Sequence, residues 1–197
     1  MGGSWEPLSV AEVVTLLADA PVTWWLSGGY ALDEFLGFTT RTHADIDVTV
    51  SRLEWPAMHA ALRPTLDIWM ARGGQLFNTD DVEVPDDVRN FWARQRGGGP
   101  WQVQFNVEPI SEGMWTYARD GRVTRPESQS AWWSGRAWCI SPGIQLLWKA
   151  KAPTPKDEED YRNVVPRLDS GERAWLSEAV RTAHWASPWA HRLEGIP

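Results

Sequence analysis

The apolar positions in the first 140 residues repeat with two different periods. Val10, Val13 and Leu17 recur at helical spacing behind Ser9, and Glu12 stands three residues after Ser9, as in a capping box. Patterns of this kind predict helices over residues 8–20, 29–37 and 51–63. Alternating or β-branched runs predict strands over residues 22–28, 45–50, 66–71 and 101–109, and a hairpin over residues 114–126. This part of the chain therefore mixes strands with helices.

The pattern changes towards the C-terminus. Ser51 and Glu54 repeat the capping-box spacing at the start of the helix predicted over residues 51–63. Residues 73–99 are polar and turn-rich and carry no readable period. After Ser141 and Pro142 the strand signals stop. Helices are predicted over residues 143–152, 156–166 and 170–185. The change predicts an α/β domain over residues 1–140 and a helical domain over residues 141–197.

Composition and charge narrow the class of protein. Of the 197 residues, 43% are hydrophobic and 23% are charged, which is typical of a globular chain. No apolar run approaches the roughly 20 residues of a membrane span, and the first residues lack the order of a secretory signal. The net charge of −7, without a block of Lys or Arg, argues against a broad nucleic-acid-binding face. It is compatible with a nucleotide, and a cationic substrate would suit it.

The single cysteine bears on location and on chemistry. Cys139 excludes an internal disulfide, and a cytoplasmic protein is expected. Its apolar neighbours favour a packed side chain over a nucleophile, although both interpretations stay open.

Two aspartates one residue apart form the first chemical candidate. On the predicted strand, Asp45 and Asp47 point to the same face, and Ile46 points the other way. Two like charges this close are costly unless a cation lies between them. Oxygen-only ligands favour Mg²⁺, which takes one or two carboxylates together with substrate phosphates.

A glycine pair sixteen or so residues earlier forms the second candidate. Gly28 and Gly29 lie between a predicted strand and a predicted helix, with Ser27 before them. Glycines allow close approach to a phosphate, and a helix N-terminus offers free N–H groups. Together with the aspartates this is a site for phosphoryl or nucleotidyl transfer. A solvated strand face and an ordinary turn are the plainer alternatives.

Resemblance to a known family sharpens this interpretation. The stretch resembles the signature of the aminoglycoside/lincosamide nucleotidyltransferases, which belong to the DNA-polymerase-β-like superfamily. The matching residues are Gly28, Gly29, Tyr30, Ala31, Asp33, Gly37, Thr40, Arg41, His43, Asp45 and Asp47. A second region is similar at Pro142, Gln145, Lys149, Lys151, Lys156, Asp157 and Asp160. The resemblance covers most of the chain and is specific in its spacing.

The resemblance implies both a fold and an activity. The fold is α+β, a mixed-sheet polymerase-β-like core followed by a small helical domain. The activity is transfer of a nucleoside monophosphate from a Mg²⁺-bound NTP, with ATP expected, to a hydroxyl of a small molecule such as an aminoglycoside or lincosamide. Carried over by position, the nucleotide-binding residues are Ser27, Gly28, Gly29, Arg41 and Lys149, and the metal-binding residues are Asp45 and Asp47. Lys149 as a solvated lysine and His43 as a structural hydrogen-bonding residue remain alternatives.

The chain departs from the family at two positions. Relatives carry a third carboxylate where this chain has Gln104, and an amide cannot accept a proton as a base. Glu108 shares the face of Gln104 and is the candidate catalytic substitute, but it lies about 13 Å further along the strand. It could instead cap the strand in solvent. Gly143 replaces an acid that relatives often carry. A degenerate member that binds nucleotide or a protein without turnover is therefore the alternative, and an enzyme acting on a protein or RNA end is a third possibility.

Overall fold

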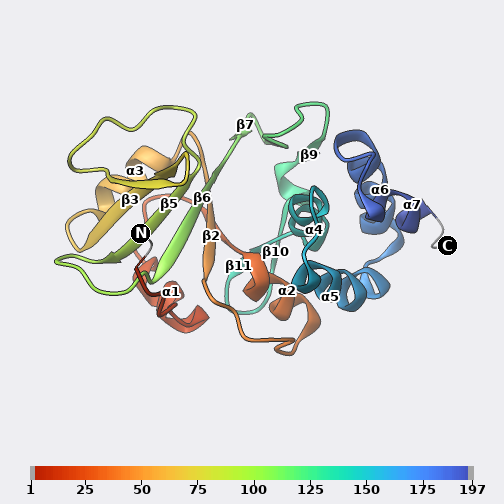
Figure 1. Ribbon diagram of the computed structural model, residues 1–197, viewed down its shortest axis with the longest axis horizontal. Coiled ribbons are helices and arrows are strands. Elements are labelled where there is room, and N and C mark those ends of the chain that lie inside the picture. The colour runs from red at the N-terminus through yellow and green to blue at the C-terminus, as the bar shows by residue number, and fades with distance from the viewer. Residues whose placement is uncertain (1–2, 195–197) are drawn as a thin grey trace.

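The computed structural model describes residues 3–194, and its centre is one mixed sheet of eight strands (Figure 1). In spatial order the strands are β10 (Ala131–Trp133), β11 (Trp138–Ile140), β1 (Trp24–Ser27), β2 (Asp47–Ser51), β6 (Val103–Glu108), β5 (Asn90–Gln95), β3 (Leu66–Arg72) and β4 (Gln75–Asn78). The pairs β1–β11 and β2–β6 are parallel, and the other pairs are antiparallel. A small second sheet holds β7 (Ile110–Ser111), β8 (Met114–Thr116) and β9 (Thr124–Pro126).

The helices divide between the two halves of the molecule. They are α1 (Val10–Leu16), α2 (Gly28–Leu36), α3 (Trp55–Leu62), α4 (Pro142–Ala150), α5 (Pro155–Val164), α6 (Ser170–Ala183) and α7 (Pro188–Glu194), with short 3₁₀ turns at Glu127–Gln129 and Val165–Arg167. In Figure 1, α3 lies with β3 and β5 in one half, and α4 to α7 form the other. α2 packs against α4 and α5, so it joins the sheet to the C-terminal helices.

The predicted α+β class is confirmed, and several local signals are confirmed with it. Glu12 donates its N–H to Ser9 Oγ at 3.2 Å, and Ser9 N–H donates to Glu12 Oε2 at 2.7 Å, which completes the capping box of α1. α2 ends at Gly37, whose φ of 77° is the left-handed conformation that favours glycine. The hairpin forms from β8 and β9, with Thr116 opposite Thr124.

Other local predictions are wrong. Residues 73–99 hold β4 and β5, because pairing with β3 and β6 overrides their polar composition. The second capping box is not formed: Ser51 Oγ donates to the carbonyl of Ile110, and α3 begins after Glu54 without a side-chain cap. β10, β11 and α7 have no clear pattern in the sequence.

Strand β2 is shorter than predicted at its N-terminal end. It begins at Asp47 and not at Asp45. The reason lies in its neighbour, because β1 ends at Ser27, the partner of Asp47, and the next residue already starts α2. No β1 backbone is left to pair with Asp45.

One apolar core runs from the sheet into the C-terminal helices. Leu26 and Ile140 of the sheet belong to the same buried cluster as Ile144 and Leu147 of α4. The domain boundary at residue 140 therefore stays a prediction. Cys139 is fully buried, and burial raises the pKa of its thiol to about 12, so it is a packed residue and no nucleophile. Within residues 3–194, no helix is long and apolar enough to cross a membrane.

Candidate active site

The glycine pair and one of the aspartates meet where β1 gives way to α2. Gly28 has a φ of 71°, and a Cβ atom built on it would lie 2.1 Å from Asp47 Oδ2. Both the backbone conformation and the space therefore require glycine. The Gly28 N–H donates to Gln145 Oε1 of α4 at 2.8 Å. A backbone donor and a carboxylate thus lie side by side, and α4 reaches them from the other half of the molecule.

Ser27 has its side chain inside the sheet. It is fully buried, and its Oγ accepts a hydrogen bond from Thr49 Oγ1 at 3.0 Å. It makes no side-chain cap to α2. The N-terminus of α2 is therefore presented through the backbone of the glycines.

His43 and Asp33 support the second glycine from behind. A Cβ on Gly29 would lie 2.1 Å from His43 Nδ1, so the imidazole packs directly on the glycine. The other ring nitrogen, Nε2, is 2.6 Å from Asp33 Oδ2. Asp33 Oδ1 accepts from the N–H of Thr40 at 3.1 Å and from its hydroxyl at 2.8 Å. His43 thus makes the structural hydrogen bond that was one of its two alternatives.

Two amides surround the Asp47 carboxylate. Asp47 pairs with Gln104 across the parallel strands β2 and β6. Gln104 Nε2 and Asn106 Nδ2 each donate to Asp47 Oδ1 at 2.9 Å. Burial, followed by repulsion from Asp45, raises the pKa of Asp47 to about 6, against the opposing hydrogen bond from Asn106. The carboxylate is held in place but is under-compensated in charge.

Asp45 lies just before β2 and contributes to the site through its charge. In the described part of the chain, no group of three or more His, Cys, Asp and Glu side chains could hold a metal by itself. Asp45 and Asp47 offer hard oxygen donors, whereas Gln104 and Asn106 turn their N–H groups towards Asp47. Such a set suits Mg²⁺ only when substrate oxygens complete it.

The two predicted phosphate-binding cations are paired with acids of α5. Arg41 Nη2 lies 3.2 Å from Asp160 Oδ2, and Lys149 Nζ lies 2.9 Å from the same oxygen. Lys149 also lies 2.8 Å from Asp157 Oδ1. Asp160 is only 2% exposed. The alternative of a solvated Lys149 is therefore wrong, and Asp160 links the segment before β2 to α4.

Glu108 lies far from Asp47 along β6. It pairs with Ser51, four residues beyond Gln104, which is about 13 Å along the strand. It is only 6% exposed, so the alternative of a solvent-facing cap is wrong. Trp115 Nε1 donates to its Oε2 at 3.1 Å, and Arg89 Nη1 is 4.0 Å from its Oε1. Burial raises the pKa of Glu108 to about 7, with Arg89 and Trp115 opposing.

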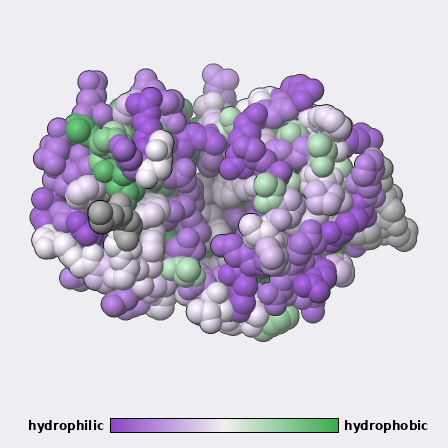
Figure 2. All heavy atoms as spheres, viewed as in Figure 1, coloured by the Kyte–Doolittle hydropathy of each residue, from purple (hydrophilic) through white to green (hydrophobic). Residues whose placement is uncertain are grey.

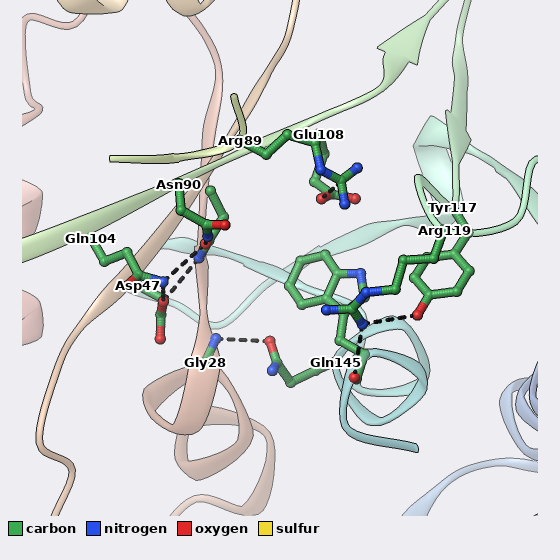
Figure 3. Close-up of a pocket in the computed structure, with 11 residues that line it drawn as sticks. Gly28, Asp47, Arg89, Asn90, Gln104, Glu108, Tyr117, Arg119 and Gln145 are labelled. Carbon is green, nitrogen blue, oxygen red and sulfur yellow. Dashed lines mark hydrogen bonds and ion pairs between the residues drawn. The ribbon is translucent and has the colours of Figure 1, made fainter. Parts of the chain in front are cut away.

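One pocket joins the site of Gly28 and Asp47 to Glu108, but its lining residues do not include Ser27, Gly29, Arg41, Asp45 and Lys149 (Figure 3). Its lining residues are Gly28, Asp47, Arg89, Asn90, Gln104, Asn106, Glu108, Tyr117, Arg119, Gln145 and Trp148. It opens in the hollow between the two halves, whose walls are largely hydrophilic (Figure 2). Sequence reasoning missed the residues from β5 and from the turn after β8. Only the hairpin around Asp120 offered a signal, because such turns often carry binding residues.

Gly143 is explained by a neighbour from α6. A Cβ on Gly143 would lie 2.5 Å from Glu172 Oε1, and that oxygen accepts the Gly143 N–H at 2.8 Å. Glu172 is also paired with Arg125. An acid from α6 thus caps the start of α4 at the position where the family resemblance implies an acid.

Comparison with known proteins agrees with the geometry. Residues 9–66 match the family model described as aminoglycoside-2''-adenylyltransferase, and no curated protein matches the chain. The crystal structure of ANT(2'')-Ia with adenylyl-2''-tobramycin shares 18% identity and a TM-score of 0.54, over 85% of this chain and 92% of that one. The solution structure of ANT(2'')-Ia shares 20% identity and a TM-score of 0.57, over 94% of this chain and 95% of that one. The crystal structure of the lincosamide adenylyltransferase LnuA bound to lincomycin shares 20% identity and a TM-score of 0.53, over 77% of this chain and 91% of that one.

The matched segment contains the glycine pair, His43 and both aspartates. The structural likeness extends the shared fold over most of the chain. The sequence match over residues 9–66 and the fold shared over most of the chain thus make this protein similar to the aminoglycoside and lincosamide adenylyltransferases.

Proposed function

We propose that the protein transfers a nucleoside monophosphate from an NTP, with ATP expected, to a hydroxyl group of a small molecule. One observation carries the proposal: the Gly28 N–H and the Asp47 carboxylate lie side by side in a cleft, with no room for a Cβ between them. A phosphate bound to that N–H would touch the carboxylate unless a cation separated the two charges. This combination of donor and acid is what metal-assisted nucleotidyl transfer requires.

The residues present fit a divalent cation. The raised pKa of Asp47 reflects a buried negative charge without a full counter-charge, and Asp45 adds to the repulsion. We assign Asp45 and Asp47 as the protein ligands of Mg²⁺, which would neutralise charge on the phosphates when bound. The amide oxygens of Gln104 and Asn106 are within reach of the same space if the side chains rotate about their terminal bonds.

The phosphates would be bound by backbone N–H groups and by two cationic side chains, which in this structure contact acids of α5. The start of α2 at Gly28 and Gly29 supplies N–H groups and a positive helix end, and Ser27 supplies backbone only. Gln145 would release the Gly28 N–H to a phosphate oxygen. Arg41 and Lys149 would exchange part of their contact with Asp160 for the triphosphate.

Proton removal from the acceptor is the weakest part of the machinery. A base must lie within about 3 Å of the hydroxyl it deprotonates, directly or through one water. Glu108 meets this condition only if the reacting phosphate reaches its end of the pocket. Otherwise positioning and metal electrostatics must carry the transfer, which phosphoryl-type reactions allow.

A second candidate function follows from the same geometry. The position beside Asp47 holds Gln104, whose amide donates a hydrogen bond to the carboxylate and offers no charge to a metal. This favours a protein that binds Mg–nucleotide, or a partner, without turnover.

Pyrophosphate release from each of the four NTPs separates the two functions. Mg²⁺ is present, and the acceptors include aminoglycosides, lincosamides and simple polyols. Release that requires an acceptor, disappears in Asp47→Asn and persists in the exposed control Asp87→Asn establishes the transferase. Calorimetric binding of Mg–ATP without release from any acceptor establishes the binding protein, and absence of both overturns the proposal.

A further inference from the structure

The pocket has two ends with different chemistry (Figure 3). The nucleotide end consists of Gly28, Asp47, Gln104 and Gln145. The acceptor end consists of Arg89, Glu108, Tyr117, Arg119 and Trp148. Arg41 and Lys149 pair with α5 and do not line the acceptor end. A triphosphate bound at Gly28 therefore leaves the acceptor end for the second substrate.

The charge at the acceptor end is positive, although the whole chain is acidic. Two guanidinium groups, Arg89 and Arg119, line it together with one carboxylate, Glu108. A third guanidinium, Arg52, acts on the same carboxylate. Asp86 and Asp87 are exposed and interact with Arg52 and Arg72, and they are not among the lining residues.

Glu108 does not offer a ready partner for a cationic substrate. It is buried, and one of its oxygens already accepts from Trp115 while the other faces Arg89. An ammonium group entering this end would meet Arg89 and Arg119 before it met an available carboxylate.

Arg119 is positioned to bind an anion. Its Nη1 donates to two neutral oxygens, the Tyr117 hydroxyl at 3.0 Å and the Trp148 carbonyl at 3.1 Å. These bonds fix the guanidinium plane but do not neutralise its charge. Guanidinium groups held in this way recognise carboxylates and phosphates through paired hydrogen bonds. Burial raises the pKa of Tyr117, so its hydroxyl stays neutral, and it lies 2.8 Å from His184 Nε2 while it accepts from Arg119.

We propose that the acceptor end binds a hydroxyl compound that carries an anionic group, a carboxylate or a phosphate, and that it selects against polycations. The inference rests on the proposed nucleotidyl transfer and names the acceptor class for it. It also reverses the expectation from net charge, because the local charge of the pocket is opposite to that of the chain.

A set of acceptors that share one sugar scaffold and differ in charge tests this inference. Trehalose, trehalose 6-phosphate, the corresponding uronic acid and 6-amino-6-deoxytrehalose differ mainly in charge, and tobramycin adds a polycation. Calorimetric titration into the protein saturated with Mg²⁺ and a non-hydrolysable ATP analogue reads binding without turnover. Pyrophosphate release with ATP reads kcat/KM for the same compounds.

The anionic members should bind about tenfold or more tightly than trehalose, in line with one charge-assisted hydrogen-bonded pair. Arg119→Gln and Arg89→Gln should each lower the ratio of anion affinity to trehalose affinity by about tenfold. Arg181→Gln, which removes an exposed arginine on α6, is the matched control and should change nothing.

Two outcomes would overturn the inference while nucleotidyl transfer stands. One is tighter binding or faster use of tobramycin or the amino sugar than of the anions. The other is a loss of about tenfold or more in Mg–ATP affinity in Arg119→Gln, which would assign this arginine to the nucleotide. If the wild-type protein does not bind Mg–ATP at all, the proposed function itself is contradicted, and this result is distinct from the two outcomes above.

Discussion

Gln104 lies directly beside Asp47 in the parallel strand pair and donates its amide N–H to Asp47 Oδ1 at 2.9 Å. Asp47 Oδ1 thus accepts a hydrogen bond from a neutral donor at the position where the family resemblance implies an acid. Beside Gln104 the acidity rests on Asp45 and Asp47, so the proposed metal binding should depend strongly on the bound nucleotide.

Replacing this amide by an acid should strengthen the metal site. In Gln104→Glu, two carboxylates would stand side by side at Asp47, so without Mg²⁺ the variant should lose on the order of 1–3 kcal/mol of stability at pH 8. With Mg–ATP, turnover should rise about tenfold or more, because a third ligand and a base are now present. Thermal unfolding with and without Mg²⁺ and the pyrophosphate assay measure both effects.

Gln75→Glu on the exposed edge strand β4 is the control, and neither effect is expected there. A Gln104→Glu protein that binds Mg²⁺ no more tightly than wild type would show that this position does not face the metal.

Alanine substitutions at two glycines with the same backbone conformation separate the effect of backbone strain from the effect of a steric clash. Gly28 and Gly37 have φ values of 71° and 77°, but a Cβ at Gly28 would strike Asp47 whereas one at Gly37 meets nothing within 4 Å. Gly37→Ala should cost about 1 kcal/mol of stability through backbone strain. It should bind Mg–ATP as wild type does.

Gly28→Ala should cost more stability and weaken Mg–ATP binding at least tenfold, because Asp47 must move. Urea unfolding and calorimetry give the two quantities. Equal nucleotide affinity in the two variants would mean that the start of α2 does not contact the phosphates.

The elements around the nucleotide end could be predicted because their signals are local. A glycine pair between a strand and a helix, and a glycine stop at residue 37, act within a few residues of sequence. The roles of His43 and Asp160 depend on partners that are 10 and 119 residues away, respectively. No sequence period reports such pairs, so the sequence leaves two roles for His43 and shows Asp160 only as part of a motif.

The acceptor end was hidden for a related reason. Arg89 and Asn90 lie in a segment whose polar composition predicts turns. Strands form there nonetheless, because they pair with β3 and β6, and their own sequence pattern does not show this. Glu108 was identified from the alternation of β6, but its burial comes from Trp115 on another strand. Alternation gives the face of a side chain, and tertiary packing decides what that face meets.

Glu108 should make stability depend on pH. Its pKa is raised from 4.5 to about 7 in the folded protein, so the folded state holds the proton more tightly than the unfolded state. The free energy of unfolding should therefore fall as pH rises from about 4.5 to about 7, by roughly 3 kcal/mol at most, and level off above. Glu108→Gln should remove this decline, so that the variant gains on wild type at pH 8.

Urea unfolding at pH 5, 6, 7 and 8 measures the difference, and the exposed Glu83→Gln serves as the control. Parallel curves for wild type and Glu108→Gln would show that Glu108 titrates normally in the folded protein.

Asp160 should oppose nucleotide binding while it supports the fold. It is buried and contacts both Arg41 and Lys149, so Asp160→Asn leaves two partly buried cations with less counter-charge. Removing one member of a buried ionic group costs about 3–5 kcal/mol, and Asp157, which still pairs with Lys149, should hold the loss to the lower part of that range. The freed cations should bind the triphosphate several-fold more tightly at low salt.

Because a ligand stabilises the folded state in proportion to its affinity, Mg–ATP should raise the Tm of Asp160→Asn more than that of wild type. Glu178→Gln breaks an exposed pair with Arg181 and should change stability by no more than about 0.5 kcal/mol, with the Mg–ATP shift unchanged. A smaller Mg–ATP shift in Asp160→Asn would mean that Arg41 and Lys149 need this aspartate to be held in position for the phosphates, and that the ionic contact prepares the site instead of competing for it.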